Sequence, residues 1–359
     1  MVDAGRFEQH PEKGSANIRH PKSAGHYFYG CFQKVIILFE EGRPDRLFIP
    51  LIHLSIALHM LRIDPVEIAT KDLHQFILGA VAPRPIAFAS TVSTGGIPNL
   101  APYSFFNAFS SNPPILIFSS NRRVSNNTTK DTLKNVEDTG EVVINVVPHS
   151  IVRQMALCSI EYGSEISEFE KAGFTTLPSE KVRPFRVAES PVHMECKVEK
   201  ILPLGEKGGA GNLIICNIVL MHIAEAVLND KGRIDPHKID LVARMGRFYY
   251  ARASGDAIFE VVQEVTAIGM GFDQLPQGIR HSHILTGNNL GQLAALPALP
   301  SREESMALAA TDARVQQVLG ARTATAELFA YAKEALDRNE VDLGARLAVL
   351  ADAMQAASA

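Results

Sequence analysis

The sequence predicts a mainly β fold, a closed or split barrel, with an α-helical appendage at its C-terminal end. Short apolar runs of strand length, separated by turn residues, recur from Ile86 to about Val227 with few helical segments between them. That pattern favours a barrel over a doubly wound sheet. Residues 301–359, by contrast, are rich in alanine and open on a helix-capping sequence.

Each predicted strand is an apolar run that ends at a turn. Gly95-Gly96, after the first run, is a hairpin signal, and the glycine-rich segment Gly205–Gly211 joins the last two runs. The predicted strands are Ile86–Val92, Leu100–Ser110, Ile115–Ser119, Glu141–Val147, Val192–Leu204 and Leu213–Val227.

Short helices are expected within the β region, and longer ones after it. Ser301 and Glu304 have the spacing of a capping box, which opens a helix that ends at Gly320. Residues Gly278–Pro300 are rich in Gly, Asn and Pro and are expected to form an ordered loop or a linker. The other predicted helices are Asp72–Gly79, Asp131–Asp138, Ser150–Cys158, Ser167–Ala172, Thr325–Asp337 and Glu340–Ala356.

The chain is accordingly divided into an atypical leader (1–59), a barrel domain (60–255) and a loop with a helical extension (256–359). The leader holds five of the twelve histidines and shows no clean periodicity. Two hypotheses account for it. Either translation starts near Met60 and the leader is an annotation artefact, or it is a mobile tail with one docking helix.

Composition excludes several classes of protein. The net charge is -4, from 35 basic and 39 acidic residues, and no basic stripe suggests a nucleic-acid surface. No apolar run reaches the length of about 18 residues that a membrane span needs. The four cysteines form no CxxC pair, so they are expected to be buried thiols in a reducing, cytoplasmic compartment. They are Cys31, Cys158, Cys196 and Cys216.

The common catalytic and nucleotide-binding motifs are absent. There is no P-loop, GxGxxG, GxSxG or HExxH sequence. His281-Ser-His283 offers two imidazoles without a third indicated ligand, so loop polarity is preferred to a metal site. Glu303-Glu304 suits the start of a helix better than acid/base chemistry.

One segment has the composition of a phosphate site. The strand Ile115–Ser119 runs into Ser120-Asn121-Arg122-Arg123, and Lys130-Asp131-Thr132 starts a helix shortly afterwards. Hydroxyls, a guanidinium and free amides at a helix start are what a phosphate needs. The alternative is a polar hairpin turn followed by an ordinary helix cap.

Two neighbouring segments suit a planar, polar-edged heterocycle. Ser90-Thr91-Val92 ends a strand and places small hydroxyls before the Gly-Gly turn. In Ala101–Asn107, Pro102 interrupts regular pairing and could leave the backbone N–H groups of the next residues free for a ligand. Of Phe105 and Phe106, one is expected in the core and the other against the ligand, because alternate residues face opposite sides.

These segments together resemble the flavin reductase-like, FMN-binding split-barrel family, which includes flavoredoxin and NAD(P)H:flavin oxidoreductases. The resemblance continues through Thr139–Val147, Ala172–Val198 and His222–Tyr250 and covers roughly residues 60–253. It implies a split β-barrel that dimerises, with FMN held near the dimer interface. The residues it assigns to the cofactor are Ser90, Thr91, Val92, Tyr103, Ser104, Phe105, Phe106, Asn107, Ser119, Ser120, Asn121, Arg122, Lys130, Asp131 and Thr132.

The resemblance also implies an activity: FMN-dependent reduction of flavin by NADH or NADPH, with the reduced flavin passed to a partner monooxygenase or another acceptor. No side chain is assigned a catalytic role, since the flavin carries the hydride chemistry. Tyr249 or Tyr250 could close over the ring. His193 either approaches the nicotinamide or is a satisfied strand histidine.

Two questions about function stay open at this point. Residues 256–359 either form a lid that selects an organic substrate or extend the dimer interface. The chain could also be a flavin-binding electron carrier without turnover, because the same pocket serves both uses.

Overall fold

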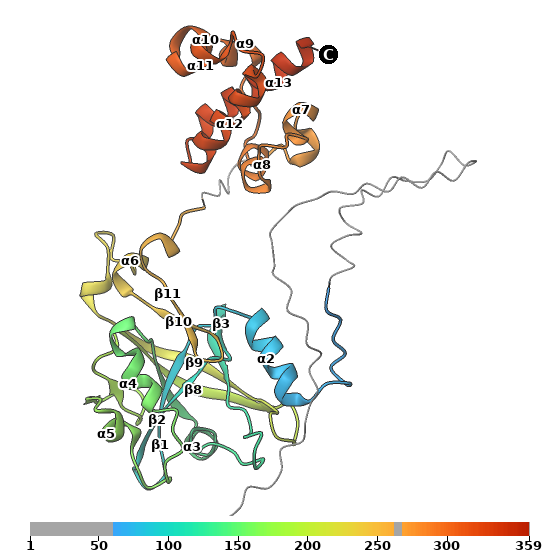
Figure 1. The fold of residues 1–359 in the computed structure, drawn as a ribbon. Coiled ribbons are helices and arrows are strands. Elements are labelled where there is room, and N and C mark those ends of the chain that lie inside the picture. The colour runs from blue at the N-terminus through green and yellow to red at the C-terminus, as the bar shows by residue number, and fades with distance from the viewer. Residues whose placement is uncertain (1–59, 262–267, 359) are drawn as a thin grey trace, which may run out of the picture. The chain divides into compact units, whose positions relative to one another are not determined.

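The computed structural model describes residues 60–261 and 268–358. The predicted leader, with both hypotheses about it, and Cys31 lie outside these residues. Strands dominate the first part, and helices make up the second (Figure 1). No helix of the described residues is long and apolar enough to cross a membrane.

Seven antiparallel strands form one sheet in the order β2-β1-β5-β8-β9-β4-β3. Its longest hairpin, β8–β9, has the glycine-rich turn 205–211 at its tip, as predicted. The strands are β1 (Ala87–Val92), β2 (Pro98–Tyr103), β3 (Phe106–Ser111), β4 (Pro114–Ser119), β5 (Glu141–Asn145), β8 (Val192–Pro203) and β9 (Asn212–Ile223).

The sheet curls into a split barrel because its two edge strands are neighbours in sequence. β2 and β3 lie at opposite edges of the sheet, yet only Ser104 and Phe105 connect them. With two residues between them, Tyr103 and Phe106 can lie at most about 11 Å apart, so the edges must come close together here. The Ser119 N–H donates to the Phe105 carbonyl at 2.8 Å and fixes this connection against the end of β4. The prediction of one strand over Leu100–Ser110 was therefore wrong: the chain changes edge at Ser104.

Strand β1 is buried along its whole length because both of its faces are covered. Ala87 and Ala89 face the barrel core, which helix α3 (Asp131–Thr139) completes. Phe88 faces a second core with α4 (Val152–Leu157) and α5 (Glu168–Ala172). Figure 1 shows these three helices beside β1 and β2.

Shorter elements complete the first part. Cys158, Cys196 and Cys216 are buried free thiols, as predicted, and burial raises the pKa of Cys158 and of Cys196 to about 12. The remaining helices are α2 (Thr70–Ala80), α6 (Pro236–Ile239) and the 3₁₀ turns His149–Ile151, Glu225–Val227 and Gly255–Ala257. Two small hairpins pair β6 (Thr176–Leu177) with β7 (Arg186–Val187) and β10 (Val242–Gly246) with β11 (Tyr249–Arg252).

The second part is a helical bundle with its own apolar core, which includes Leu293, Leu328, Leu336 and Leu347. Its two longest helices, α12 (Ala324–Asp337) and α13 (Val341–Ser358), lie within two residues of their predicted bounds. Before them come a 3₁₀ turn (Phe272–Gln274), α7 (Gln277–Arg280), α8 (Gly287–Ala294), α9 (Arg302–Met306), α10 (Leu308–Thr311) and α11 (Ala313–Val318).

Two predictions for this part were wrong. Residues 278–300 contain α8, whose capping box joins Thr286 and Asn289, so the Gly- and Asn-rich composition concealed a helix. The single helix expected from Ser301 to Gly320 is broken into three. Asp312 adopts an extended conformation and its carboxylate caps α11, which ends the preceding helix.

Candidate functional site

The glycine-rich turn between β8 and β9 supports the segment that was predicted to hold a phosphate. The Arg122 N–H donates to the Ala210 carbonyl at 2.8 Å, and the Gly209 N–H donates to the Arg122 carbonyl at 3.0 Å. A Cβ on Gly211 would lie 2.5 Å from Ser119 Oγ, so a larger residue here would require the Ser119 side chain to move. The sequence indicated a turn here, but not its packing against residues 119–124.

Within that segment the guanidinium groups are already engaged. Arg122 Nε donates to Asn127 Oδ1 at 2.8 Å, and Arg123 Nε lies 2.6 Å from Glu161 Oε1. Asn121 accepts a hydrogen bond of 2.8 Å from the Ser119 hydroxyl. These contacts give the loop a fixed shape. They leave Lys130 as the cation of this site that is least engaged with other side chains.

Helix α3 begins where the phosphate site was predicted. Lys130 is the N-cap residue, and no side chain caps the helix. Its first N–H groups therefore remain available, and the helix dipole favours an anion there. Lys130 Nζ lies 5.0 Å from the centre of the Tyr103 ring. Burial, and then the charge of Arg123, lower the pKa of Lys130.

A small cavity of about 50 Å³ opens between β2, the start of α3 and residues 158–162. It brings together four predicted site residues, Tyr103, Lys130, Asp131 and Thr132. Sequence reasoning missed Glu161 and Glu168, which also line it. They come from a loop and from α5, and no local sequence signal connects them to β2.

Two hydroxyls at this site are buried without a hydrogen-bond partner among the described residues, those of Tyr103 and Ser120. The Tyr103 hydroxyl faces Thr132 and Ser120, and burial raises its pKa. Buried polar groups in proteins almost always have partners, so an unpartnered pair indicates a place for a polar ligand. This feature fits the phosphate-bearing cofactor that the sequence predicted.

The structure does not bring Ser90 and Thr91 to one face. The Ser90 hydroxyl, also buried and unpartnered within the described chain, lies on the Phe88 side of β1. Thr91 Oγ1 accepts from Asn99 at 3.2 Å and from Asn135 at 3.0 Å, so it joins the sheet to α3. Val92 is buried beside it at the end of β1.

The connection between β2 and β3 offers free backbone donors. The N–H groups of Ser104 and Phe105 have no partner in the part of the chain that the structure describes. The Phe105 ring meets His74 of α2 edge-on at 6.3 Å, whereas Phe106 packs on the barrel core. Asn107 is exposed, and its Oδ1 accepts from the N–H of Ala108.

The aromatic residues expected over the ring differ in their surroundings. Tyr249 is 71% exposed. Tyr250 instead lies under the Arg244 guanidinium, which is 4.7 Å from the centre of its ring.

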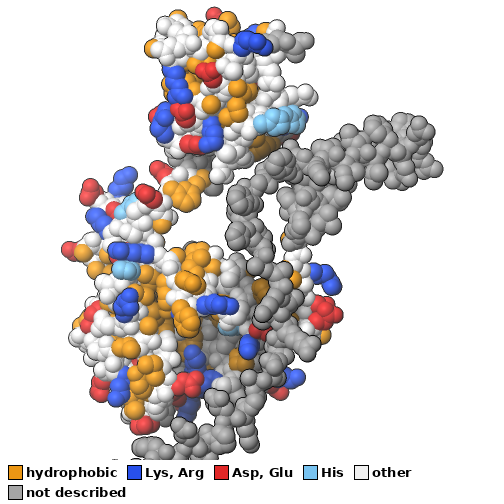
Figure 2. Space-filling view, viewed as in Figure 1, with side chains coloured by type: hydrophobic (Ala, Val, Ile, Leu, Met, Phe, Trp, Pro, Cys, Tyr) orange, Lys and Arg blue, Asp and Glu red, His pale blue; other side chains and the backbone are white. Residues whose placement is uncertain are grey.

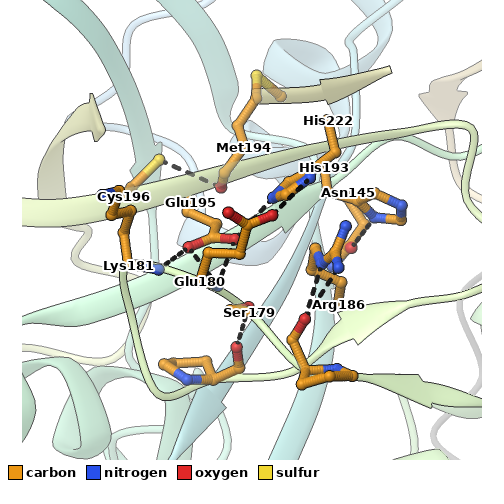
Figure 3. A network of polar contacts seen from close by, with 12 residues as sticks. Asn145, Ser179, Glu180, Lys181, Arg186, His193, Met194, Glu195, Cys196 and His222 are labelled. Carbon is orange, nitrogen blue, oxygen red and sulfur yellow. Dashed lines mark hydrogen bonds and ion pairs between the residues drawn. The ribbon is translucent and has the colours of Figure 1, made fainter. Parts of the chain in front are cut away.

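A polar network lies on β8 and β9, around the buried carboxylate of Glu195 (Figure 3). That carboxylate accepts from the N–H groups of Glu180 and Lys181 and from His222 Nε2, at 2.6–3.1 Å. Hydrogen bonding by these donors lowers its pKa against the opposing effect of burial. The network therefore anchors the loop around residue 180 to the sheet.

Residues of the β part resemble a known protein family. The model of the flavin reductase like domain matches residues 79–244, which span the cavity and the glycine-rich turn. An uncharacterised protein of Aquifex aeolicus is 37% identical over 189 residues, which are 53% of this chain and 94% of that protein. The chain belongs to the flavin reductase-like family.

Two solved structures of similar proteins agree with that assignment. Nitrilotriacetate monooxygenase component B from Bacillus cereus is 34% identical, with a TM-score of 0.53, and the match covers 56% of this chain and 98% of that one. The 2-nitrobenzoate 2-nitroreductase of Pseudomonas fluorescens is 28% identical, with a TM-score of 0.51, and the match covers 58% of this chain and all of that one. This flavin reductase-like chain carries a helical part beyond the matched residues.

Proposed function

We propose that the chain is an FMN-dependent oxidoreductase of the flavin reductase type that takes its electrons from NADH or NADPH. The observation that carries the proposal is the unpartnered hydroxyl pair of Tyr103 and Ser120 beside Lys130 and the uncapped start of α3. Family membership supports the same conclusion. Two of the similar solved proteins are, by their names, a monooxygenase component and a nitroreductase.

The phosphate end of the cofactor would lie at the start of α3. Lys130 would provide the main charge, because Arg122 and Arg123 are held by Asn127 and Glu161. The Ser120 hydroxyl and the first N–H groups of α3 would donate to the phosphate oxygens. Thr132 would orient this end through Asn99, which donates to its Oγ1 at 2.8 Å.

The ring end would lie along the β2–β3 connection. The free N–H groups of Ser104 and Phe105 would donate to the polar edge of the ring, and Phe105 and Asn107 would lie beside it. Donors aimed at that edge would stabilise the negative charge of the reduced form. When bound, FMN supplies the hydride-transfer chemistry, and the protein supplies orientation and exclusion of water.

The first experiment is a visible spectrum of the purified protein followed by titration with FMN. We expect Lys130→Gln to weaken FMN binding by roughly tenfold or more, since a charged hydrogen bond contributes about 1.5–3 kcal/mol. Lys134→Gln, on the exposed face of the same helix, is the matched control and should bind normally. A colourless protein that takes up no FMN refutes the proposal.

The electron donor is tested by anaerobic rapid mixing of the FMN-loaded protein with NADH and with NADPH. Bleaching of the flavin absorbance by either one supports a reductase. An electron carrier without turnover is the second candidate, and absence of bleaching with both nucleotides would leave it as the function.

The proposal has two further parts. The chain would pass reduced flavin to a cytoplasmic monooxygenase, and it would assemble as a homodimer. The name of the Bacillus cereus protein supports the first. The exposed edge strand β3 supports the second, because Phe109 at its centre is 63% exposed. Light scattering of the purified protein measures the dimer directly, and a monomer at micromolar concentration would contradict it.

A further inference from the structure

The helical part of the chain has a cavity of its own, formed by residues outside the family match. Its volume is about 710 Å³, within the range of small-molecule sites. Its walls come from the start of α7 and the loop after that helix, from the start of α12 and from the end of α13. Figure 2 shows histidine side chains at the surface of this helical part.

Nitrogen-bearing side chains line this cavity, and no carboxylate does. Arg322, His281 and His283 are exposed in its wall. None of these three side chains makes a hydrogen bond or an ion pair within residues 60–261 and 268–358. Arg314 and Arg346, elsewhere in the bundle, are paired with carboxylates. The lining of the cavity therefore carries the positive charge of Arg322 and no carboxylate.

Two acidic residues lie next to lining residues without lining the cavity themselves. Glu327, one turn along α12, accepts a hydrogen bond from the Thr323 hydroxyl. Asp352 Oδ1 would lie 2.2 Å from a Cβ added to Gly278. Neither belongs to the lining, so Arg322 is presented to an anion by a lining without carboxylates.

The start of α12 adds backbone donors to the same wall. The N–H groups of Thr325 and Ala326 have no acceptor in the described chain, and both residues line the cavity. A helix of 14 residues directs its positive dipole end there. Ile284 and Phe329 contribute apolar surface. Together these groups suit a molecule with one anionic end and one apolar end.

We propose that this cavity binds a small organic oxyanion, a carboxylate or a phosphate ester with an apolar body. Arg322 pairs with the oxyanion, and the Thr325 and Ala326 N–H groups and the two imidazoles donate to it. The apolar body lies against Ile284 and Phe329. The helical part is then a second ligand site, independent of the flavin pocket.

The test is equilibrium dialysis of the full chain, saturated with FMN so that the flavin site does not take up the probe. Radiolabelled benzoate, phenyl phosphate and inorganic phosphate are the three probes. We expect saturable binding of benzoate or phenyl phosphate at one site per chain, and the tighter of the two identifies the oxyanion. Inorganic phosphate should bind more weakly; equal affinity overturns the apolar contact.

Variants decide whether the binding occurs in this cavity. Arg322→Gln should weaken it at least roughly tenfold, as expected for loss of a charged hydrogen bond. Arg302→Gln, an exposed arginine of α9 without an ion pair in the described chain, is the matched control and should change nothing. Absence of saturable binding overturns the proposal, and so does binding unchanged in both Arg322→Gln and the double variant His281→Asn/His283→Asn. Visible absorbance of the same samples reports flavin uptake, so failure of the flavin proposal is seen separately.

Discussion

His193 Nδ1 lies 2.9 Å from Asn145 Oδ1, and this contact fixes the protonation of the ring. The same oxygen accepts the Val187 N–H at 3.0 Å, while the Asn145 amide nitrogen donates to the Phe88 carbonyl. Because Oδ1 can only accept, Nδ1 carries the hydrogen. Burial, and then the charge of Arg186, lower the pKa of His193 to about 4. It is thus a neutral, hydrogen-bonded strand histidine, the second of the two roles considered from the sequence.

This neutral histidine predicts a loss of stability in mild acid. As pH falls, the ring of the unfolded chain gains its proton near the ordinary pKa of about 6.5, whereas the folded ring resists until about 4. The free energy of unfolding should therefore fall between these pH values, by about 3 kcal/mol in total at 1.36 kcal/mol per unit. Urea unfolding at several pH values measures it.

The variant His193→Gln should lose this part of the pH dependence. His237→Gln, which changes an exposed histidine, should keep it. An unchanged slope in His193→Gln would show that other groups dominate the response.

The Glu195 carboxylate should contribute strongly to stability. It is fully buried and accepts from two N–H groups and from His222. Glu195→Gln removes the charge and turns an amide group toward a donor, so we expect a loss of about 2–4 kcal/mol in the free energy of unfolding. Glu199→Gln, on the exposed end of the same strand, should lose less than about 0.5 kcal/mol. Equal losses in urea unfolding would contradict this account.

Gly211→Ala should disturb the proposed phosphate loop by steric contact alone. The new Cβ would lie 2.5 Å from Ser119 Oγ, and crowding of this kind costs about 1–3 kcal/mol. We expect lower stability and weaker FMN binding. Gly95→Ala, in the open turn between β1 and β2, is the control, since its nearest neighbour would be 3.7 Å away. Adding Ser119→Ala should restore stability; if it does not, the steric explanation fails.

Asn99 should act together with Thr132. Its amide donates to Thr91 Oγ1 and to Thr132 Oγ1, and all three side chains are buried. Asn99→Ala leaves both hydroxyls without this donor and should lower the free energy of unfolding by about 1–3 kcal/mol. A double-mutant cycle with Thr132→Val tests the contact. Losses that simply add would show that the two residues do not interact.

Patterns confined to one segment predicted the structure well. The β8–β9 hairpin followed from two apolar runs and the glycine-rich turn between them, and α13 from an alanine-rich segment, and these are local signals. The break at Ser104 was missed because the run from Leu100 to Ser110 stays apolar across it, and only the sheet order reveals it. Helix α8 was missed because capping by Thr286 and Asn289 outweighed its glycines.

The residues of the candidate site likewise divide into those that a local pattern predicts and those that it does not. Lys130 and Thr132 could be predicted, because a helix start after a polar loop is visible in the sequence. Glu161 and Glu168 could not, since tertiary packing alone brings them to Tyr103. The support from Gly211 was hidden for the same reason, because it depends on a neighbour some ninety residues away.

The two-residue link between β2 and β3 limits how wide the barrel can become. At this connection the edge strands can separate no further than Ser104 and Phe105 can span. The short connection therefore limits the circumference of the barrel. Inserting a few glycines into this connection would allow the edge strands β2 and β3 to move apart. The backbone that offers donors to a ligand would then be held less firmly in place.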